Sequence, residues 1–225
     1  MPNHFGERLN QYRHTIEDLV VDIVDPYRIS TIESTALARR IEKTNMAFYR
    51  FKPDCGRDKR AVTALTAQLG LGVPDHNLSA DADGLSPIQA HPEGVRQRYI
   101  PYTDKKLNWH TDGYYYPTSN PVRSMLLHCV RPARKGGATE LINHEIVYAL
   151  LALKNPEYIA ALSRADVMTI PANMQAPDGP REAQSGPVFW QDPDRIYMRY
   201  TTRRHNIQWR QGPLSHEDIE ALVEL

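Results

Sequence analysis

The stretch Asn108-Trp109-His110-Thr111-Asp112-Gly113 is the part of the chain from which both the fold and the chemistry can be argued. In an extended backbone, residues two apart point to the same side, so His110 and Asp112 could reach one metal ion together. Imidazole and carboxylate suit Fe(II), Mn(II) or Zn(II), and a second histidine would complete the facial triad of non-haem iron oxygenases. The stretch therefore predicts a metal site on a strand. The plain alternative is a polar turn that closes a strand.

The same spacing recurs at His216-Glu217-Asp218, which allows the pattern to be judged by its context. This second copy follows Ser215 with capping-box spacing and begins a helical apolar pattern. Residues two apart on a helix diverge by roughly 200°, so they cannot easily bind one ion. The context therefore favours metal binding by His110 and Asp112 and not by the second copy.

The composition describes one large globular domain. Lys+Arg and Asp+Glu both number 27 in the 225 residues, so the net charge is +0. Nucleic acid and anionic membranes are therefore not favoured as partners. No apolar run approaches the roughly 18 residues of a membrane helix. The polar start lacks a signal-peptide core. Two cysteines without C-x-x-C spacing favour a reducing compartment. We expect a cytoplasmic protein, and a homo-oligomer is left open.

Apolar periodicity and turn residues predict the elements around this stretch. Helices are expected at 6–24, at 34–44 with Ser34 as N-cap, at 59–71, at 144–153 after Asn143, and at 156–163. Strands are expected at 46–51, 96–101, 123–130, 138–142 and 167–171, and as a hairpin at 188–191 and 195–201. The segments 73–94 and 172–186 are rich in loop-forming residues and are expected to be long loops.

Three arginines gather at the end of the expected hairpin, at Arg199, Arg203 and Arg204. A solvated basic edge is one interpretation. Capture of a substrate carboxylate or sulfonate is the other, because the guanidinium fork binds such groups through two hydrogen bonds. His128, on an expected strand, is interpreted as a hydrogen-bonded core histidine rather than a ligand.

Read together, the expected strand, N-W-H-T-D-G, an aromatic run, an apolar strand and G-G-A-T resemble the taurine dioxygenase/TfdA-like family of Fe(II)- and 2-oxoglutarate-dependent dioxygenases. The likeness covers 96–208 and is most specific at Trp109–Asp112 and at Gly136–Thr139. The resemblance implies an α+β, mostly β fold: a double-stranded β-helix, or cupin-like jelly-roll barrel, with flanking helices. Where this chain has Ala138, the family commonly has Asp.

The resemblance also implies the roles of individual residues. His110 and Asp112 would be catalytic iron ligands, and Thr139 would hold the distal carboxylate of 2-oxoglutarate. The implied reaction is hydroxylation of a small molecule with release of succinate and CO2, and an anionic substrate is one option. Asn108, Tyr114 and Arg203 would bind that substrate, although Tyr114 could equally be a core or rim aromatic.

One departure from the family concerns its late barrel strands. These carry a second histidine ligand and an arginine for 2-oxoglutarate, and neither His205 nor His216 fits that pattern. We therefore expect residues 1–225 to be a single oxygenase domain that lacks its last strands, with the third ligand unidentified. Two alternatives stay open. One is a catalytically incomplete jelly-roll that binds a ligand, and the other is a zinc or manganese cupin-like enzyme.

Overall fold

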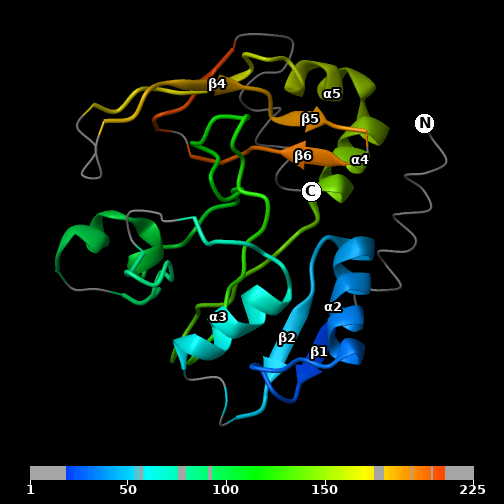
Figure 1. Cartoon of the computed structure of the whole chain (residues 1–225). Helices are drawn as coiled ribbons and strands as arrows, with labels where there is room; N and C mark the ends of the chain where they lie inside the picture. Colours follow the sequence, from blue (N-terminus) through cyan, green and yellow to red (C-terminus); the bar gives the residue numbers. More distant parts are fainter. Residues whose placement is uncertain are drawn as a thin grey trace. The chain divides into compact units, whose positions relative to one another are not determined.

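The structure is a computed structural model that describes the ranges 19–53, 55, 58–75, 80–90, 93–174, 180–193, 195–203 and 205–210 (Figure 1). Contacts along the chain define two compact units. Unit 1 comprises Met1–Asp75 with Leu126–Ile146, and unit 2 comprises His76–Met125 with Val147–Leu225. Each unit is described here by itself. The expectation of a single oxygenase domain stays a prediction.

Unit 1 is built on a β-α-β arrangement. β1 (Val20–Ile23) runs parallel to β2 (Phe48–Phe51), and α2 (Thr31–Thr44) connects the two strands. α3 (Lys59–Gln68) follows β2. Side chains of a strand point to opposite faces in turn, so only alternate residues of β1 are buried. These residues join α2, β2 and α3 in one core, made of Val21, Ile23, Leu37, Phe51, Ala61 and Leu65.

The start of α2 is fixed by a capping box. The backbone N–H of Glu33 donates to the Ser30 hydroxyl at 3.2 Å, and the Ser30 N–H donates to the Glu33 carboxylate at 2.6 Å. The Val24 N–H donates to the same carboxylate at 2.7 Å, which ties the helix to the end of β1. The expected N-cap at Ser34 is therefore wrong, because the helix begins one turn earlier, after Ser30.

Unit 2 contains two small antiparallel sheets. β3 (Met168–Ile170) lies between β4 (Gln184–Gly186) and β7 (Gln208–Trp209). β5 (Phe189–Gln191) and β6 (Ile196–Met198) form the hairpin that the sequence predicts. The predicted helices are also found: α4 (His144–Lys154) begins at the boundary between the units, and α5 (Pro156–Leu162) follows it.

Arg199, immediately after β6, joins the hairpin to the three-stranded sheet. The residue is only 3% exposed, and its guanidinium donates to the carbonyls of Met168, Gly186 and Gln184. Burial lowers the pKa of Arg199 because a cation loses hydration there. The interpretation of the arginine cluster as a solvated edge is therefore wrong for Arg199, which holds two sheets together inside unit 2.

Several expected elements are wrong. Residues 96–101 lie in the 3₁₀ turns η2 (Val95–Arg98) and η3 (Ile100–Tyr102) instead of a strand. In the described residues, 123–130 and 138–142 form no strand. The first of these segments is exposed rather than buried, with Met125 at 55% and Leu127 at 50%. Val20–Ile23, expected at the end of a helix, is a strand. The rest of that helix before Leu19, and the helix expected after Ser215, lie outside the described residues.

His128 has the hydrogen bond that was expected of it. Its Nδ1 lies 3.0 Å from the Tyr49 hydroxyl, and the two rings stack with centroids 5.7 Å apart. Both residues belong to unit 1, and Tyr49 packs against the core of that unit. This arrangement confirms His128 as a hydrogen-bonded packing histidine.

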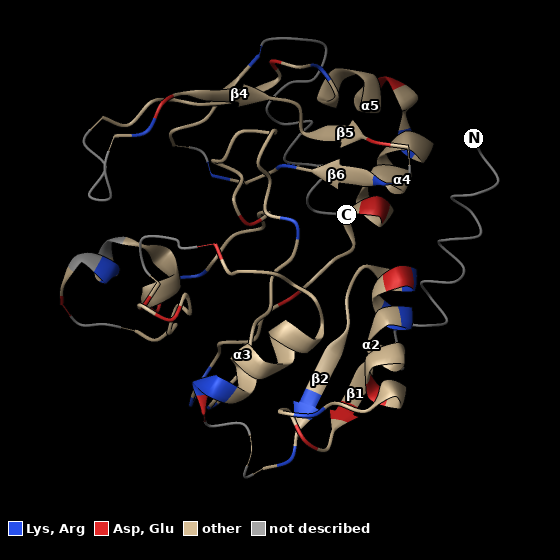
Figure 2. Cartoon of the chain, in the orientation of Figure 1, with Lys and Arg blue, Asp and Glu red and all other residues tan. Residues whose placement is uncertain are grey.

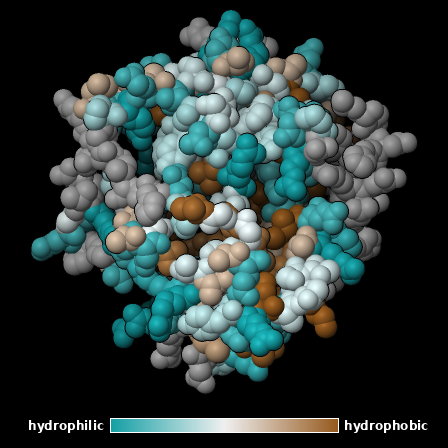
Figure 3. Space-filling model, viewed as in Figure 1, coloured by the Kyte–Doolittle hydropathy of each residue, from teal (hydrophilic) through white to brown (hydrophobic). Residues whose placement is uncertain are grey.

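The three small sheets form no closed barrel within the part of the chain that the structure describes. The observed architecture is a mixture of helices and small sheets, and the jelly-roll stays a prediction. Positive and negative residues are interspersed over the ribbon (Figure 2). Hydrophobic residues reach the surface on the face that Figure 3 shows. None of the described helices has the length and apolarity to cross a membrane.

Candidate metal-binding site

The backbone around His110 is extended, as expected, and pairs with the segment after β6. His110 and Thr201 face each other in an antiparallel bridge. Two backbone hydrogen bonds flank this pair, from Thr111 to Tyr200 at 2.9 Å and from Thr202 to Trp109 at 3.0 Å. They define a non-hydrogen-bonded antiparallel pair, in which the two opposite side chains are close and share one face. We call this pairing the site ribbon, meaning 109–112 with 200–203.

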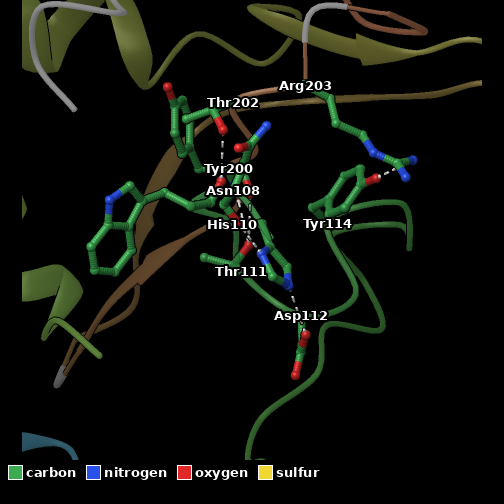
Figure 4. Close-up of polar contacts among 9 residues, drawn as sticks. Asn108, His110, Thr111, Asp112, Tyr114, Tyr200, Thr202 and Arg203 are labelled. Carbon is green, nitrogen blue, oxygen red and sulfur yellow. Dashed lines mark hydrogen bonds and ion pairs between the residues drawn. The ribbon is translucent and has the colours of Figure 1, made fainter. Parts of the chain in front are cut away.

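The His110 imidazole is oriented by a carbonyl. Its Nδ1 lies 2.7 Å from the Asn108 carbonyl oxygen, which can only accept a hydrogen bond, so Nδ1 carries the proton. The other nitrogen, Nε2, lies 3.5 Å from Oδ1 of Asp112 (Figure 4). In a neutral imidazole with this tautomer, Nε2 has the free lone pair that a metal requires. The nitrogen and oxygen donors thus converge on one point.

The electrostatics of this pair favour a positive charge between the two donors. The hydrogen bond with Asp112 is the main cause that raises the pKa of His110, and the Asn108 carbonyl adds to it. Burial and the charge of Arg203 act in the opposite direction and lower that pKa. The side chains remain partly accessible, at 26% for His110 and 43% for Asp112. A cation from solvent can therefore reach them.

The chain turns sharply after Asp112, and this turn requires glycine. Gly113 has φ +66, a conformation that other residues adopt at a cost. A Cβ on Gly113 would lie only 2.4 Å from Cγ2 of Val122. The Tyr116 N–H donates to the Gly113 carbonyl at 2.8 Å and closes the turn. The turn ends the extended stretch at Asp112, and the tyrosine run follows it directly.

Arg203 and Tyr114 lie beside His110 and Asp112. Nη1 of Arg203 donates to the Tyr114 hydroxyl at 3.1 Å (Figure 4). Arg203 is exposed, unlike Arg199, and its charge reaches His110. The Thr201 hydroxyl accepts a hydrogen bond from the Arg203 N–H at 3.3 Å, which holds the backbone at this end of the site ribbon.

A small hollow borders Asp112 on the hairpin side. Its wall mixes aromatic and apolar side chains, among them Tyr116, Val122, Trp190 and Tyr197, with polar ones such as Asp112 and Thr118. Trp190 and Tyr197 are cross-strand partners in the hairpin, and their rings stack with centroids 5.4 Å apart. The hollow offers an apolar surface next to a carboxylate.

The structure brings most of the predicted site residues together and leaves others apart. His110, Asp112, Asn108, Tyr114 and Arg203 are neighbours in unit 2, although Asn108 contributes its backbone carbonyl and not a side-chain contact. Thr139 is exposed and belongs to unit 1, whose position relative to unit 2 is not determined. Among the described residues, no group of three or more His, Cys, Asp or Glu could hold a metal.

Sequence reasoning did not find Thr111 and Thr202, which hold the site ribbon together. The Thr111 hydroxyl accepts a hydrogen bond from the Tyr200 N–H at 3.0 Å, across 89 residues of sequence. A pairing over that distance has no local signal. The hairpin strand predicted at 195–201 was the one available hint that this segment is extended.

Comparison with known proteins identifies the class of the chain. The family model described as "Taurine catabolism dioxygenase TauD, TfdA family" matches residues 10–225. The chain therefore belongs to the TauD/TfdA family of dioxygenases, which confirms the resemblance found in its motifs. The family is one of oxygenases and takes small-molecule substrates.

A curated relative is a uridine-5'-phosphate dioxygenase from Streptomyces sp. The two sequences are 31% identical over 139 residues, which cover 61% of this chain and 49% of the relative. The chain thus spans about half the length of the relative. No solved structure matches the chain.

Proposed function

We propose that the protein is an Fe(II)- and 2-oxoglutarate-dependent dioxygenase that hydroxylates a small-molecule substrate and releases succinate and CO2. One observation carries the proposal. The Asn108 carbonyl holds the proton on Nδ1 of His110, so the free nitrogen and the Asp112 carboxylate converge to 3.5 Å. Membership of the TauD/TfdA family supports the same reading.

The donor set fits Fe(II) in chemistry and in orientation. One imidazole and one carboxylate are two of the three protein ligands in a facial triad, and such a carbonyl is the usual partner that orients a metal-binding histidine. None of the described residues joins His110 and Asp112 as a third ligand. A ligand-binding protein without turnover is therefore the second candidate, and the pair of only two donors is the observation that favours it.

Fe(II) and 2-oxoglutarate, when bound, would supply activation of O2 and oxidation of a C–H bond. The residues of this chain would orient and shield the reactants. Asn108 would fix the imidazole, and the turn at Gly113 would place the Asp112 carboxylate. The hollow beside Asp112 would hold part of a substrate against Trp190 and Tyr197. Thr139 would donate its hydroxyl to the distal carboxylate of 2-oxoglutarate, as the family pattern implies.

The other expectations from the sequence belong to this proposal. They are a double-stranded β-helix around the site and a cytoplasmic location. Uridine 5'-phosphate is the first substrate to try, because the relative is named for it. Homo-oligomer formation is open to measurement by light scattering.

Metal binding tests the ligand pair. Titration calorimetry with Mn(II), or with Fe(II) without oxygen, should show a site in the wild type that His110→Ala and Asp112→Ala lose. His205→Ala is the matched control, because His205 is an exposed histidine of the same unit. Equal affinity in all four proteins would remove His110 and Asp112 as ligands.

Turnover separates the two candidate functions. Substrate-stimulated succinate release that requires iron and 2-oxoglutarate would support the dioxygenase. Binding of 2-oxoglutarate without succinate release under any substrate would support the second candidate. Thr139→Val should weaken 2-oxoglutarate binding by about 1–2 kcal/mol and Thr139→Ser should not, because serine keeps the hydroxyl.

A further inference from the structure

Two arginines from one cluster have opposite surroundings. The guanidinium of Arg199 is buried and donates to three backbone carbonyls. Arg203 is exposed, and its side-chain hydrogen bond goes to the neutral hydroxyl of Tyr114. No carboxylate forms an ion pair with Arg203 among the residues that the structure describes. The charge of Arg203 is thus not neutralised by an acid in that part of the chain.

The register of the site ribbon places the Arg203 side chain on the same face as the side chain of His110. His110 and Thr201 are directly opposite, so their side chains share a face. Arg203 is two residues beyond Thr201, and alternation in an extended segment returns its side chain to that same face. The charge of Arg203 acts on His110, which is consistent with this placement.

Tyr114 restrains the guanidinium without using up its donors. A guanidinium has five N–H groups, and the bond to the Tyr114 hydroxyl takes one of them. Thr201 in addition accepts from the backbone N–H of Arg203. A cation held in place, with donors that no described residue occupies, is preorganised for a planar or tetrahedral oxyanion, since less side-chain entropy is lost on binding.

We propose that Arg203, positioned by Tyr114, is the anion receptor of this site and binds a carboxylate or phosphate group of the molecule that reacts at His110 and Asp112. This inference rests on the proposed function, and it makes an anionic group a requirement for productive binding. That group can belong to the substrate or to 2-oxoglutarate. The chemistry of recognition is the same in both cases, and binding measurements tell them apart.

The test uses four variants of the full chain. Arg203→Met removes the charge and keeps the length of the side chain, and Arg203→Lys keeps the charge but loses the fork. Tyr114→Phe removes only the hydroxyl that holds the guanidinium. Arg195→Met is the matched control, because Arg195 is an exposed arginine of the same unit, in the turn between β5 and β6.

Two anions are titrated into each protein by calorimetry: inorganic phosphate without metal, and 2-oxoglutarate with Mn(II) present and oxygen absent. Arg203→Met should weaken binding of at least one anion about tenfold or more, as expected for loss of hydrogen bonds to a charged group. Arg203→Lys and Tyr114→Phe should each weaken anion binding by a smaller factor, and Arg195→Met should bind both anions as tightly as the wild type. Added salt should weaken anion binding in the wild type more than in Arg203→Met.

The pattern of losses identifies the source of the anion. Weaker phosphate binding with unchanged 2-oxoglutarate binding assigns Arg203 to the substrate, and weaker 2-oxoglutarate binding assigns it to the co-substrate. Unchanged affinity for both anions in Arg203→Met and Arg203→Lys overturns the inference. If Arg203→Met does not fold, judged by circular dichroism, then Arg203→Lys and Tyr114→Phe decide. A wild-type protein that binds no Mn(II) would instead contradict the proposed function. The phosphate titration without metal would still test Arg203.

Discussion

Thr111 and Tyr200 hold the site ribbon together through a side chain as well as through the backbone. The Thr111 N–H donates to the Tyr200 carbonyl at 2.9 Å, and the Tyr200 N–H donates back to the Thr111 hydroxyl at 3.0 Å. Thr111 stands between His110 and Asp112 in sequence. The geometry of the candidate metal pair therefore depends on a contact with a segment 89 residues away.

Replacing Thr111 by valine should destabilise the protein by about 1–2 kcal/mol, because valine keeps the shape but takes away the acceptor of the Tyr200 N–H. Thr111→Ser keeps the hydroxyl and should cost less. Urea unfolding followed by tyrosine and tryptophan fluorescence measures both. Equal destabilisation by the two substitutions would show that the hydroxyl does not hold the ribbon.

Gly113→Ala should cost more than Gly70→Ala, although the two glycines have nearly the same φ, +66 and +68. Both substitutions carry the left-handed backbone penalty of about 1–2 kcal/mol. Only Gly113→Ala also forces a Cβ to 2.4 Å from Val122, whereas the space around Gly70 is open. The melting temperatures of the two variants give the comparison. Equal melting temperatures would contradict the close approach of Val122 to the turn.

Glu33→Gln should reveal a pH-dependent contribution to stability. The hydrogen bond from Ser30 is the main cause that lowers the pKa of Glu33 below its ordinary value of 4.5, and the Val24 N–H adds to it. A carboxyl with a lowered folded-state pKa stabilises the fold above its unfolded pKa, and the stability is lost as pH falls through the folded-state pKa. The variant should therefore be less stable than wild type at pH 7, with a difference that shrinks below pH 4.5.

The control for this pH series is Glu42→Gln, which makes the same change at an exposed position of the same helix. Free energies of unfolding at several pH values give the comparison for both variants. A difference between Glu33→Gln and wild type that stays constant from neutral to acid pH would argue against a role for the ionised carboxylate.

Arg199→Met should destabilise the protein by about 2–4 kcal/mol, because three carbonyls lose a charged donor and the hairpin loses its tie to β3 and β4. Arg195→Met, at an exposed position of the same hairpin, should stay within about 0.5 kcal/mol of wild type. Chemical unfolding curves measure both. Similar midpoints for the two variants would mean that the buried arginine does not hold the sheets.

The sequence predicts best where the signal is local. The helices at 144–153 and 156–163 follow asparagine caps, and the hairpin around Asp192 has turn residues between two apolar runs. The capping box Ser30-Thr31-Ile32-Glu33 was also a local signal, and it would have placed the start of α2 correctly. The apolar spacing through Val20 and Ile23 fits a helix and a strand alike, and pairing with β2 decides in favour of the strand.

The remaining misses have non-local causes. An apolar run such as 123–130 can become a strand only if another strand pairs with it, and none does within the described residues. Of the site, the sequence predicts the extended backbone and the common side of His110 and Asp112. The structure agrees on the common side, and it shows a bridge at His110, but Asp112 already lies in the turn that follows. The sequence could not show that Arg199 is buried while Arg203 is exposed, because tertiary packing alone separates two arginines four residues apart.

The two segments of the site ribbon lie 89 residues apart in sequence, so metal binding should report whether the chain is folded. A peptide that contains only 108–113 lacks the partner segment, so it must bear the entropy of ordering its own backbone and should bind Mn(II) far more weakly than the whole chain. In the folded protein, pairing with 200–203 has already ordered this segment. An ion that binds the folded form alone raises the midpoint of thermal denaturation by mass action. A thermal shift with added Mn(II) would thus report the assembled pair before any substrate is known.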